Sequence, residues 1–332
     1  MAERFAEVKL NESAGRETLS ALRTALETYG FFYVDPGSMF PRQLQLALLE
    51  MMRAFFSTER SAKQARIASV VRNGFTRGYI GFGAESGSWR TEVKEAFSYG
   101  FEWSDEDRRQ PCEHKLQGPN CWPQESVGVD VRAMRVLCTE VYDCCIRTAQ
   151  QVAKLVAECV GLPREHFDEH LVGGELISLM RLFHYVAYSD ADEALIGSSP
   201  HTDWGFLTLI LPSETDYSGL EVYFENEWIP VPQKPGSLIV NCGDFLSLSL
   251  NGAVQSPLHR VVLPEHGQDR YSAVFFFYPG YDAQFTASRK QGYSLFEDQR
   301  AVDAREADSR DISGHHESFG QFIARKWTQV GR

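Results

Sequence analysis

The pattern of apolar and polar positions divides the chain near residue 165. Before that point, apolar residues recur every three or four positions, which is the spacing of one face of a helix. Gly30 and Gly161 each follow such a stripe, and Pro41 opens one, as expected at helix ends. We therefore predict helices over residues 19–29, 41–55 and 129–160, with one short strand at 31–34.

After residue 165 the pattern changes to short apolar runs broken by Gly, Pro and Asn, which is typical of a sandwich or barrel. The predicted strands cover residues 176–188, 206–211, 219–224, 237–241, 258–263 and 271–278. Asn251-Gly252 has the composition of a hairpin turn. The predicted fold is α+β and mainly β: a double-stranded β-helix, or jelly roll, with N-terminal helices packed around it.

We expect this fold to form one catalytic unit. Residues 1–165 would supply a helical and substrate-loop region, and residues 166–332 the jelly-roll core with a C-terminal helix. That last helix is predicted at 318–327, where aromatic and aliphatic residues follow helical spacing and need a surface to cover. Two positions for it are open: a lid near the barrel mouth that excludes water, or packing on the N-terminal helices.

A candidate metal site begins at His201-Thr202-Asp203, which we expect to open a strand. Side chains at i and i+2 of a strand share a face, so an imidazole and a carboxylate would meet there. His259 lies in a second predicted strand, which a jelly roll can bring alongside. Two His and one carboxylate form the facial triad of non-haem Fe(II) oxygenases. Zinc also accepts such a set, and the alternative without a metal is that these are ordinary polar residues at a barrel rim.

A candidate anion anchor follows at Arg270-Tyr271-Ser272, where Arg270 and Ser272 share one face of a predicted strand. The strand is otherwise apolar, and an arginine entering it needs a buried anion. An Arg fork binds a carboxylate with two hydrogen bonds, and a Ser hydroxyl adds a third. The expected partner is the far carboxylate of 2-oxoglutarate, whose oxo-acid end would chelate the metal beside dioxygen. A structural surface arginine is the alternative.

Composition and charge exclude several other classes of protein. The net charge is −12 and no tract is dense in Lys or Arg, so we expect no nucleic-acid partner. No apolar run approaches a membrane span, and the N-terminus lacks a secretory pattern. The seven cysteines include no CxxC, which suits reduced thiols in a cytoplasmic protein. The sequence carries no signal for an oligomeric state.

Several longer stretches resemble the isopenicillin N synthase-like family of Fe(II)- and 2-oxoglutarate-dependent oxygenases. The resemblance runs along nearly the whole chain, in TRGYIGFGAES, EVKEAFSYG, GPNCWP, HTDWGFLTLI, the segment from GLEVYF to SLNG, and SPLHRVVLPEHGQDRYSAVFFFYP. It implies a double-stranded β-helix, the iron triad and 2-oxoglutarate. It also implies a role for Tyr185 in binding the oxo acid near the metal. No catalytic side chain is expected beyond the metal ligands.

The resemblance departs from the family pattern at Phe183, which stands where many members have an Asn that contacts the oxo acid. His184 is expected to point away from the metal, on the face opposite Tyr185. For substrate contacts the candidates are Arg72, Trp204 and Phe276. Arg72 could meet an anionic substrate, Trp204 could line the pocket or fill the barrel, and Phe276 should face the interior.

The predicted reaction is oxidation of a C–H bond in a small-molecule metabolite, by hydroxylation, desaturation or oxidative cyclisation. Succinate and carbon dioxide would be released from 2-oxoglutarate. Two alternatives stay open at this point. One is an iron oxidase of the same fold that needs no 2-oxo acid, and the other is a jelly roll that binds metal without catalysis.

Overall fold

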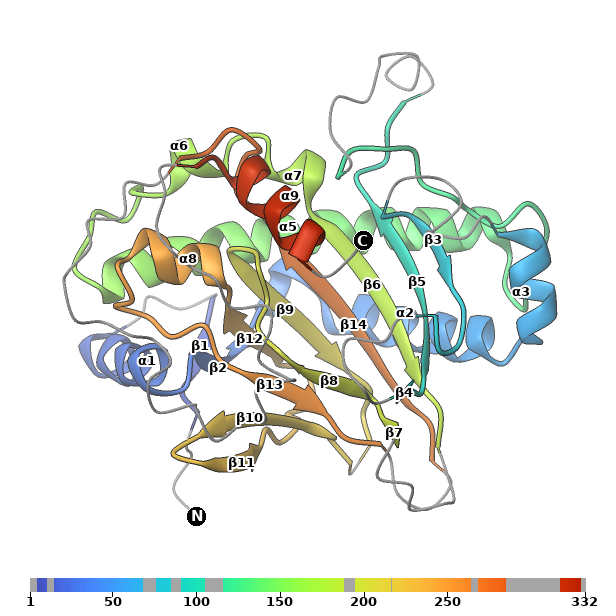
Figure 1. Cartoon of the computed structure of the whole chain (residues 1–332), viewed down its shortest axis with the longest axis horizontal. Helices are drawn as coiled ribbons and strands as arrows, with labels where there is room; N and C mark the ends of the chain where they lie inside the picture. Colours follow the sequence, from blue (N-terminus) through green and yellow to red (C-terminus); the bar gives the residue numbers. More distant parts are fainter. Residues whose placement is uncertain are drawn as a thin grey trace.

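The computed structural model of the chain contains two sheets that face each other, with the longer helices on one side (Figure 1). It describes residues 5–10, 15–67, 76–84, 91–104, 116–187, 195–215, 217–263, 268–284 and 317–329. The helices and strands below are those of the described residues.

The larger sheet has eight strands and the smaller has four. In spatial order the larger sheet contains β1 (Glu7–Lys9), β2 (Phe31–Asp35), β12 (Leu238–Cys242), β9 (Leu207–Pro212), β14 (Arg270–Phe277), β6 (Leu179–Tyr185), β5 (Lys94–Gly100) and β3 (Gly78–Ile80). The smaller sheet contains β11 (Glu227–Pro230), β10 (Leu220–Phe224), β13 (His259–Val261) and β8 (Ser198–His201). A separate parallel pair joins β4 (Thr91–Glu92) and β7 (Leu195–Ile196).

The eight strands β6 and β8 to β14 form the predicted jelly roll. The chain passes from one sheet to the other between β6 and β8, between β8 and β9, and again on later connections, so that four strands end in each sheet. An apolar interior lies between the sheets, with Tyr185 and Val274 from the larger sheet and Val222 and Val261 from the smaller. The predicted fold class is therefore confirmed.

The outer face of the larger sheet packs on helices. These are α1 (Arg16–Thr28), α2 (Arg42–Phe56), α3 (Arg60–Arg66) and α5 (Val131–Cys159), with η1 (Gly37–Met39) between the first two. Val152 of α5 and Phe275 of β14 are both buried in this layer, each contributing about 1.5–3 kcal/mol by its burial. The Asp130 side chain accepts a hydrogen bond from the Ala133 amide and so caps α5 where the sequence predicted its start.

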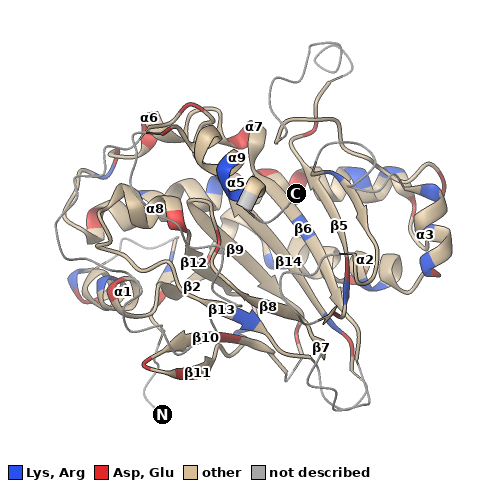
Figure 2. Ribbon diagram, in the orientation of Figure 1, with Lys and Arg blue, Asp and Glu red and all other residues tan. Residues whose placement is uncertain are grey.

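The charged residues follow this layering. In Figure 2, blue and red concentrate on the helices and connecting segments, whereas the strands of the larger sheet are mostly tan. The remaining helices, α6 (Asp168–Leu171), α7 (Gly174–Ile177), α8 (Asp244–Ser249) and α9 (Phe319–Gln329), gather at one end of the barrel (Figure 1). None of the described helices combines the length and apolar character needed to span a bilayer.

The prediction for the first half was incomplete. The strand predicted at 31–34 is present as β2, but β1, β3 and β5 also join the larger sheet. Strand β5 was missed because its sequence, KEAFSYG, shows no alternation of apolar and polar residues. Every residue in it is buried, including Lys94 and Glu95, so both of its faces lie inside the protein.

Two expectations for the second half also need correction. Asn251 and Gly252, with φ of 52° and 77°, do not form a hairpin but turn the chain after α8, where the Gly252 amide donates to the Ser247 carbonyl. The two-residue hairpin lies instead at Glu225-Asn226, between β10 and β11. The predicted strand 176–188 begins as helix α7, and β6 starts only at Leu179.

Candidate metal and co-substrate site

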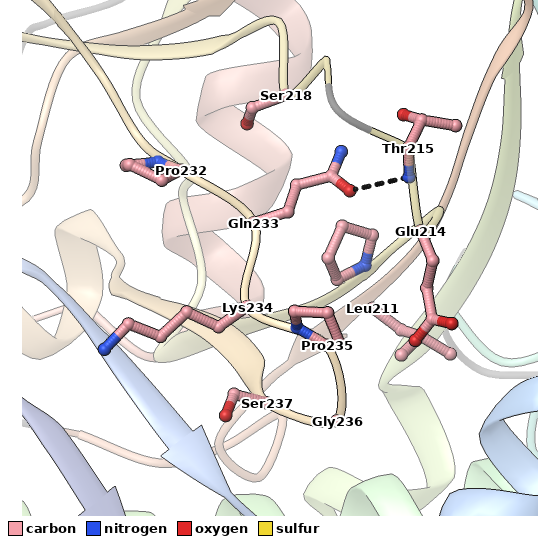
Figure 3. A pocket seen from close by; sticks show the side chains of 11 residues that line it. Leu211, Glu214, Thr215, Ser218, Pro232, Gln233, Lys234, Pro235, Gly236 and Ser237 are labelled. Atoms are coloured by element: carbon pink, nitrogen blue, oxygen red, sulfur yellow. Dashed lines mark hydrogen bonds between the residues drawn. The ribbon is translucent and has the colours of Figure 1, made fainter.

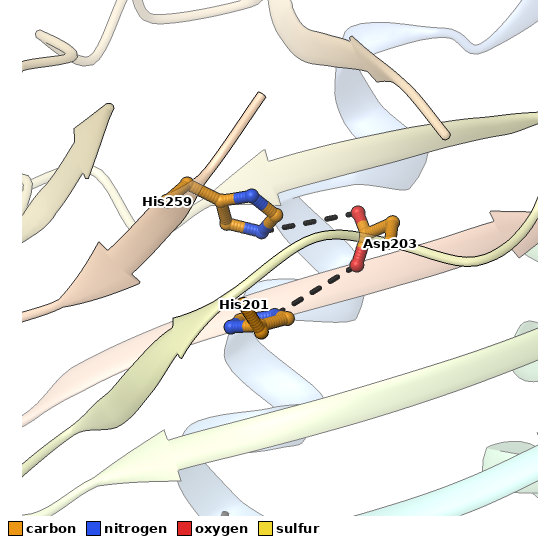
Figure 4. Close-up of side chains that lie close together, drawn as sticks. All are labelled: His201, Asp203 and His259. Carbon is orange, nitrogen blue, oxygen red and sulfur yellow. Dashed lines mark ion pairs between the residues drawn. The ribbon is translucent and has the colours of Figure 1, made fainter. Parts of the chain in front are cut away.

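His201, Asp203 and His259 meet at one edge of the smaller sheet (Figure 4). His201 is the last residue of β8 and lies directly opposite His259, the first residue of β13. Asp203 follows in the turn after β8, so the motif closes a strand rather than opening one. One ligating atom from each residue lies within 4.8 Å of the other two.

Both imidazoles are fixed in one orientation by their Nδ1 atoms. Nδ1 of His201 lies 2.7 Å from the Ser199 carbonyl oxygen, and Nδ1 of His259 lies 3.1 Å from that of Pro257. A carbonyl only accepts hydrogen bonds, so each Nδ1 carries a proton and Nε2 is the ring atom left for a metal. The two Nε2 atoms face Asp203 at 3.8 Å and 3.9 Å.

The Asp203 carboxylate has one oxygen occupied and one available. Oδ2 accepts hydrogen bonds from the Thr208 hydroxyl at 2.6 Å and from the Asn241 amide at 2.8 Å. Oδ1 accepts none from the described residues and faces His201. Burial by itself raises the pKa of Asp203, but the two imidazoles and these two donors together hold the pKa below its ordinary value.

The site is closed around His259 and open beside His201. The exposed fraction of the side chain is 6% for His259 and 39% for His201. Phe31 packs edge-on against the His259 ring at 5.6 Å. Burial, with a smaller contribution from His201, lowers the pKa of His259 to about 4, which leaves the ring neutral at physiological pH.

These three side chains fit a divalent metal. They offer two imidazole nitrogens and one carboxylate oxygen, and the other polar atom of each side chain is already held by hydrogen bonds. Such outer partners orient metal ligands in proteins. A metal held by these three side chains would keep further coordination positions open for a co-substrate, as in the facial triad.

Arg270 provides the second half of the site. Its side chain is buried, its Nε donates to the Ser218 carbonyl at 2.5 Å, and its Nη1 lies 3.4 Å from the Ser272 hydroxyl. No carboxylate in the described ranges lies within ion-pair distance of it. Burial lowers the pKa of Arg270, an effect that Tyr185 opposes. A buried guanidinium with only neutral partners fits an anionic ligand, as the sequence predicted.

Strand register fixes how the predicted residues lie along β14. Arg270, Ser272 and Phe276 alternate with outward residues, and Phe276 borders the barrel interior as expected. Tyr185 pairs with Arg270, whose guanidinium lies 4.6 Å from the centre of the Tyr185 ring. Phe276 instead pairs with Thr208, which bonds Asp203. Tyr185 therefore lies beside the anchor.

The other residues considered in the sequence lie in different places relative to the candidate metal site. His184 points away from the metal, with its nitrogens 2.9 Å from Glu95 and 2.8 Å from Asp269, as predicted. Trp204 packs with Phe276 in the apolar cluster at the α9 end of the barrel. Arg72 lies outside the described residues.

Four supporting residues were not predicted from the sequence. Asn241 and Thr208 hold Asp203, and both sit on inner faces of buried strands. Glu92 accepts from the Ser199 amide at 2.8 Å and pairs with Lys94 at 2.7 Å. Since the Ser199 carbonyl holds His201, this pair supports the ligand from behind. For Thr208 and Asn241 the signal in the sequence was a polar residue inside an apolar run, whereas Glu92 and Lys94 lie in a polar stretch and had no such signal.

Helix α9 packs at the end of the barrel near the metal. Its Phe319 and Phe322 contact Phe245 of α8, with ring centres 5.1 Å and 5.5 Å apart. The same cluster includes Trp204 and Phe276, but none of its described members belongs to α1, α2, α3 or α5. Packing on the N-terminal helices, one of the two expected positions, is therefore not observed.

A cavity of about 330 Å³ lies elsewhere, between the segments around residues 211–218 and 232–237 (Figure 3). Gln233 spans it and accepts a hydrogen bond from the Thr215 amide at 3.4 Å. Its lining includes Ser218, whose carbonyl holds Arg270, but none of the triad. Its lining also includes Pro212, which pairs with Ser272, so the cavity borders the anchor and not the triad.

Comparison with known proteins gives a consistent picture. Residues 176–279 match the model of the 2OG-Fe(II) oxygenase superfamily, and residues 4–125 match that described as non-haem dioxygenase in morphine synthesis N-terminal. The 2-oxoglutarate-dependent dioxygenase citB of Monascus ruber is 32% identical, over 80% of this chain and 80% of its own. Clavatol oxidase claD of Penicillium crustosum is 31% identical, over 84% and 85%.

Solved structures share the fold. A full-length Neurospora crassa protein in complex with alpha-KG and thymine superposes with a TM-score of 0.74 and 20% identity, covering 98% of this chain and 96% of its own. At that identity the likeness establishes the fold alone.

Proposed function

The chain belongs to the 2OG-Fe(II) oxygenase superfamily, and on that premise we propose that His201, Asp203 and His259 hold the iron while Arg270 and Ser272 anchor 2-oxoglutarate. The enzyme is a 2-oxoglutarate-dependent dioxygenase that uses Fe(II), 2-oxoglutarate and dioxygen. The proposed reaction is oxidation of a C–H bond in a small organic molecule. Bound iron, with the 2-oxo acid and dioxygen, supplies the oxidising power, and succinate and carbon dioxide are released.

The placement of Arg270 carries the residue assignments. It is a buried cation without a carboxylate partner among the described residues, and it lies in the same barrel as the triad. A dicarboxylic 2-oxo acid has an oxo-acid end for the metal and a second carboxylate for such a cation. The Arg270 fork and the Ser272 hydroxyl then orient the co-substrate along β14.

The remaining residues prepare the site. Ser199 and Pro257 keep each Nδ1 proton in place, so that both Nε2 lone pairs stay aimed at the metal position. Trp204 and Phe276 line the approach on the side of α9, and we propose that the substrate binds against them. Their apolar surface would exclude water from the reacting bond. Tyr185 would support the far carboxylate beside Arg270.

A small-molecule substrate is supported by the relatives. The Neurospora protein was solved with thymine, and clavatol oxidase is named for a small molecule. The His201 side chain is 39% exposed, which would give such a compound access to the metal position.

The experiment is a screen of small metabolites with purified protein, Fe(II), dioxygen and 2-oxoglutarate, measured as succinate formed and substrate consumed. We expect succinate to rise with one class of compound, whose product gains an oxygen atom or loses two hydrogens. Full turnover of that compound without any 2-oxo acid would make the protein an oxidase of the same fold. Absence of oxygen consumption across the screen in iron-loaded protein would contradict catalysis.

A further inference from the structure

A buried ion pair joins the C-terminal helix to the interior. Lys326 of α9 has no exposed side-chain surface, and its Nζ lies 3.2 Å from Oδ2 of Asp244, whose side chain is 4% exposed. Asp244 is the first residue of α8. A lysine is almost never fully buried unless it is paired, so this contact is a specific feature of how α9 docks.

The same carboxylate holds both segments that carry the proposed metal ligands. Oδ2 also accepts from the Thr202 hydroxyl at 3.2 Å, and Oδ1 accepts from the Ser256 hydroxyl at 2.6 Å. Thr202 lies between His201 and Asp203 in the sequence. Ser256 directly precedes Pro257, whose carbonyl fixes the His259 ring.

The backbone adds a third link. The Asp244 amide donates to the Asp203 carbonyl at 2.7 Å, and the next amide, that of Phe245, donates to Gly205. Gly243 packs so closely here that an added Cβ would lie 2.2 Å from the Gly205 carbonyl oxygen. The turn containing Asp203 therefore rests directly on the start of α8.

We propose that Asp244 is a positioning residue for the metal centre and that Lys326 supplies the counter-charge that keeps its carboxylate in place. Docking of α9 and the geometry of the triad then form one unit, although α9 contributes no ligand. This inference rests on the proposed function, because it takes the triad to be the metal site.

The reason is electrostatic. Without Lys326, the buried Asp244 carboxylate loses its counter-charge, and a buried charge without a partner is costly. The carboxylate would then turn toward water and away from the Thr202 and Ser256 hydroxyls that it holds. The two segments then lose their common support, and the ligand atoms lose their fixed separation.

The test compares metal affinity in Lys326→Met with the wild type, using Mn(II) titration at fixed pH, with and without 2-oxoglutarate. Loss of an outer support typically weakens metal binding about 10–100-fold, and we expect a rise of that size in the dissociation constant. The visible spectrum of the Co(II)-loaded protein should change as well, because it reports ligand geometry.

The matched control is Arg325→Met, one position away on the same helix. Arg325 pairs with Glu317 at 2.5 Å, and its side chain is 27% exposed. We expect its affinity for Mn(II) to stay within about twofold of the wild type, as for most surface pairs. A Lys326→Met protein that folds and binds Mn(II) like this control overturns the inference.

Two further variants keep the test decisive if Lys326→Met does not fold. Thr202→Val leaves the ion pair intact and removes only its link to the ligand segment, and we expect about tenfold weaker Mn(II) binding. Asp244→Asn/Lys326→Met removes both charges and should bind Mn(II) more tightly than either single variant. Unchanged affinity in Thr202→Val overturns the inference, whereas failure of the wild type to bind Mn(II) overturns the proposed function instead.

Discussion

The two ends of the barrel differ in how completely the chain satisfies its own polar groups. At the metal end, one oxygen of Asp203 accepts two hydrogen bonds, and Nδ1 of each imidazole donates a hydrogen bond to a backbone carbonyl. At the anchor end, the partners of the buried Arg270 among the described residues are a carbonyl, a hydroxyl and an aromatic ring. The metal end is organised by the chain itself, whereas the part of the chain that the structure describes places no anion at the anchor end.

This difference separates two tasks. A metal needs ligands held in fixed positions before it arrives, and the contacts behind each ligand provide that. A co-substrate that binds and leaves in every cycle needs a charge kept available for it. A permanent carboxylate beside Arg270 would compete with 2-oxoglutarate, so a neutral surrounding suits exchange.

The largest expected effect comes from removing a ligand at the organised end. His259→Ala should abolish iron binding and activity, because two remaining ligands do not hold the metal in a facial site. Iron content after anaerobic loading measures this, with circular dichroism to verify unchanged helical content. Asp203→Ala and His201→Ala should behave alike. Full iron occupancy in a folded His259→Ala protein would refute the ligand assignment.

The next largest effect is expected at the anchor end. Arg270→Ala removes the partner of a buried carboxylate, a loss of about 3–5 kcal/mol, or roughly 10²–10³-fold in affinity. The Michaelis constant for 2-oxoglutarate should rise by about that factor, with iron still bound. Ser272→Ala should cost about tenfold, because it removes one neutral donor to a charged group. Equal effects of the two changes would show that the fork is not the main anchor.

Pyruvate offers a chemical version of the same test. It has an oxo-acid end but no far carboxylate, so it should replace 2-oxoglutarate poorly in the wild type. In Arg270→Ala the difference between the two acids should shrink to within about tenfold, since the discriminating charge is gone. A preference for 2-oxoglutarate that survives this substitution would place the anchor elsewhere.

Acid should weaken the metal end of the metal-free protein. The pKa of His259 is about 4 in the folded state against an ordinary value of 6.5, so between these values the unfolded chain binds the proton and the folded chain does not. Stability therefore falls as the pH drops from 6.5 to 4, by at most about 3 kcal/mol. Urea unfolding across this range measures it. His259→Gln should show a flatter pH profile.

The smallest expected effect concerns α9 as a lid. Trp327 borders the cluster that includes Trp204 and Phe276. Trp327→Ala should open this end to water and raise succinate formed per product by a few-fold, about the size expected when water exclusion is partial. An unchanged ratio in a stable variant would leave α9 with a purely positional role through Lys326.

The chain's own pattern predicted the jelly roll, and it offered His201 with Asp203 and Arg270 with Ser272 as candidate pairs, because each pair rests on local spacing. A strand alternates its faces, so Arg270 and Ser272 had to share one, and a buried arginine favours an anionic partner. The helices α1, α2 and α5 followed from apolar stripes that need a sheet to cover. The same reasoning placed His184 away from the metal.

Only the tertiary structure decided what depends on long-range contact. Strand β5 has no alternating pattern because both its faces are buried, and the Asn251-Gly252 turn closes a helix because α8 precedes it. The supports of the site come from distant segments: Asn241 reaches Asp203 across 38 positions, and Lys326 reaches Asp244 across 82. Such pairs produce no periodic pattern in the sequence, because residues so far apart come into contact only in the folded chain.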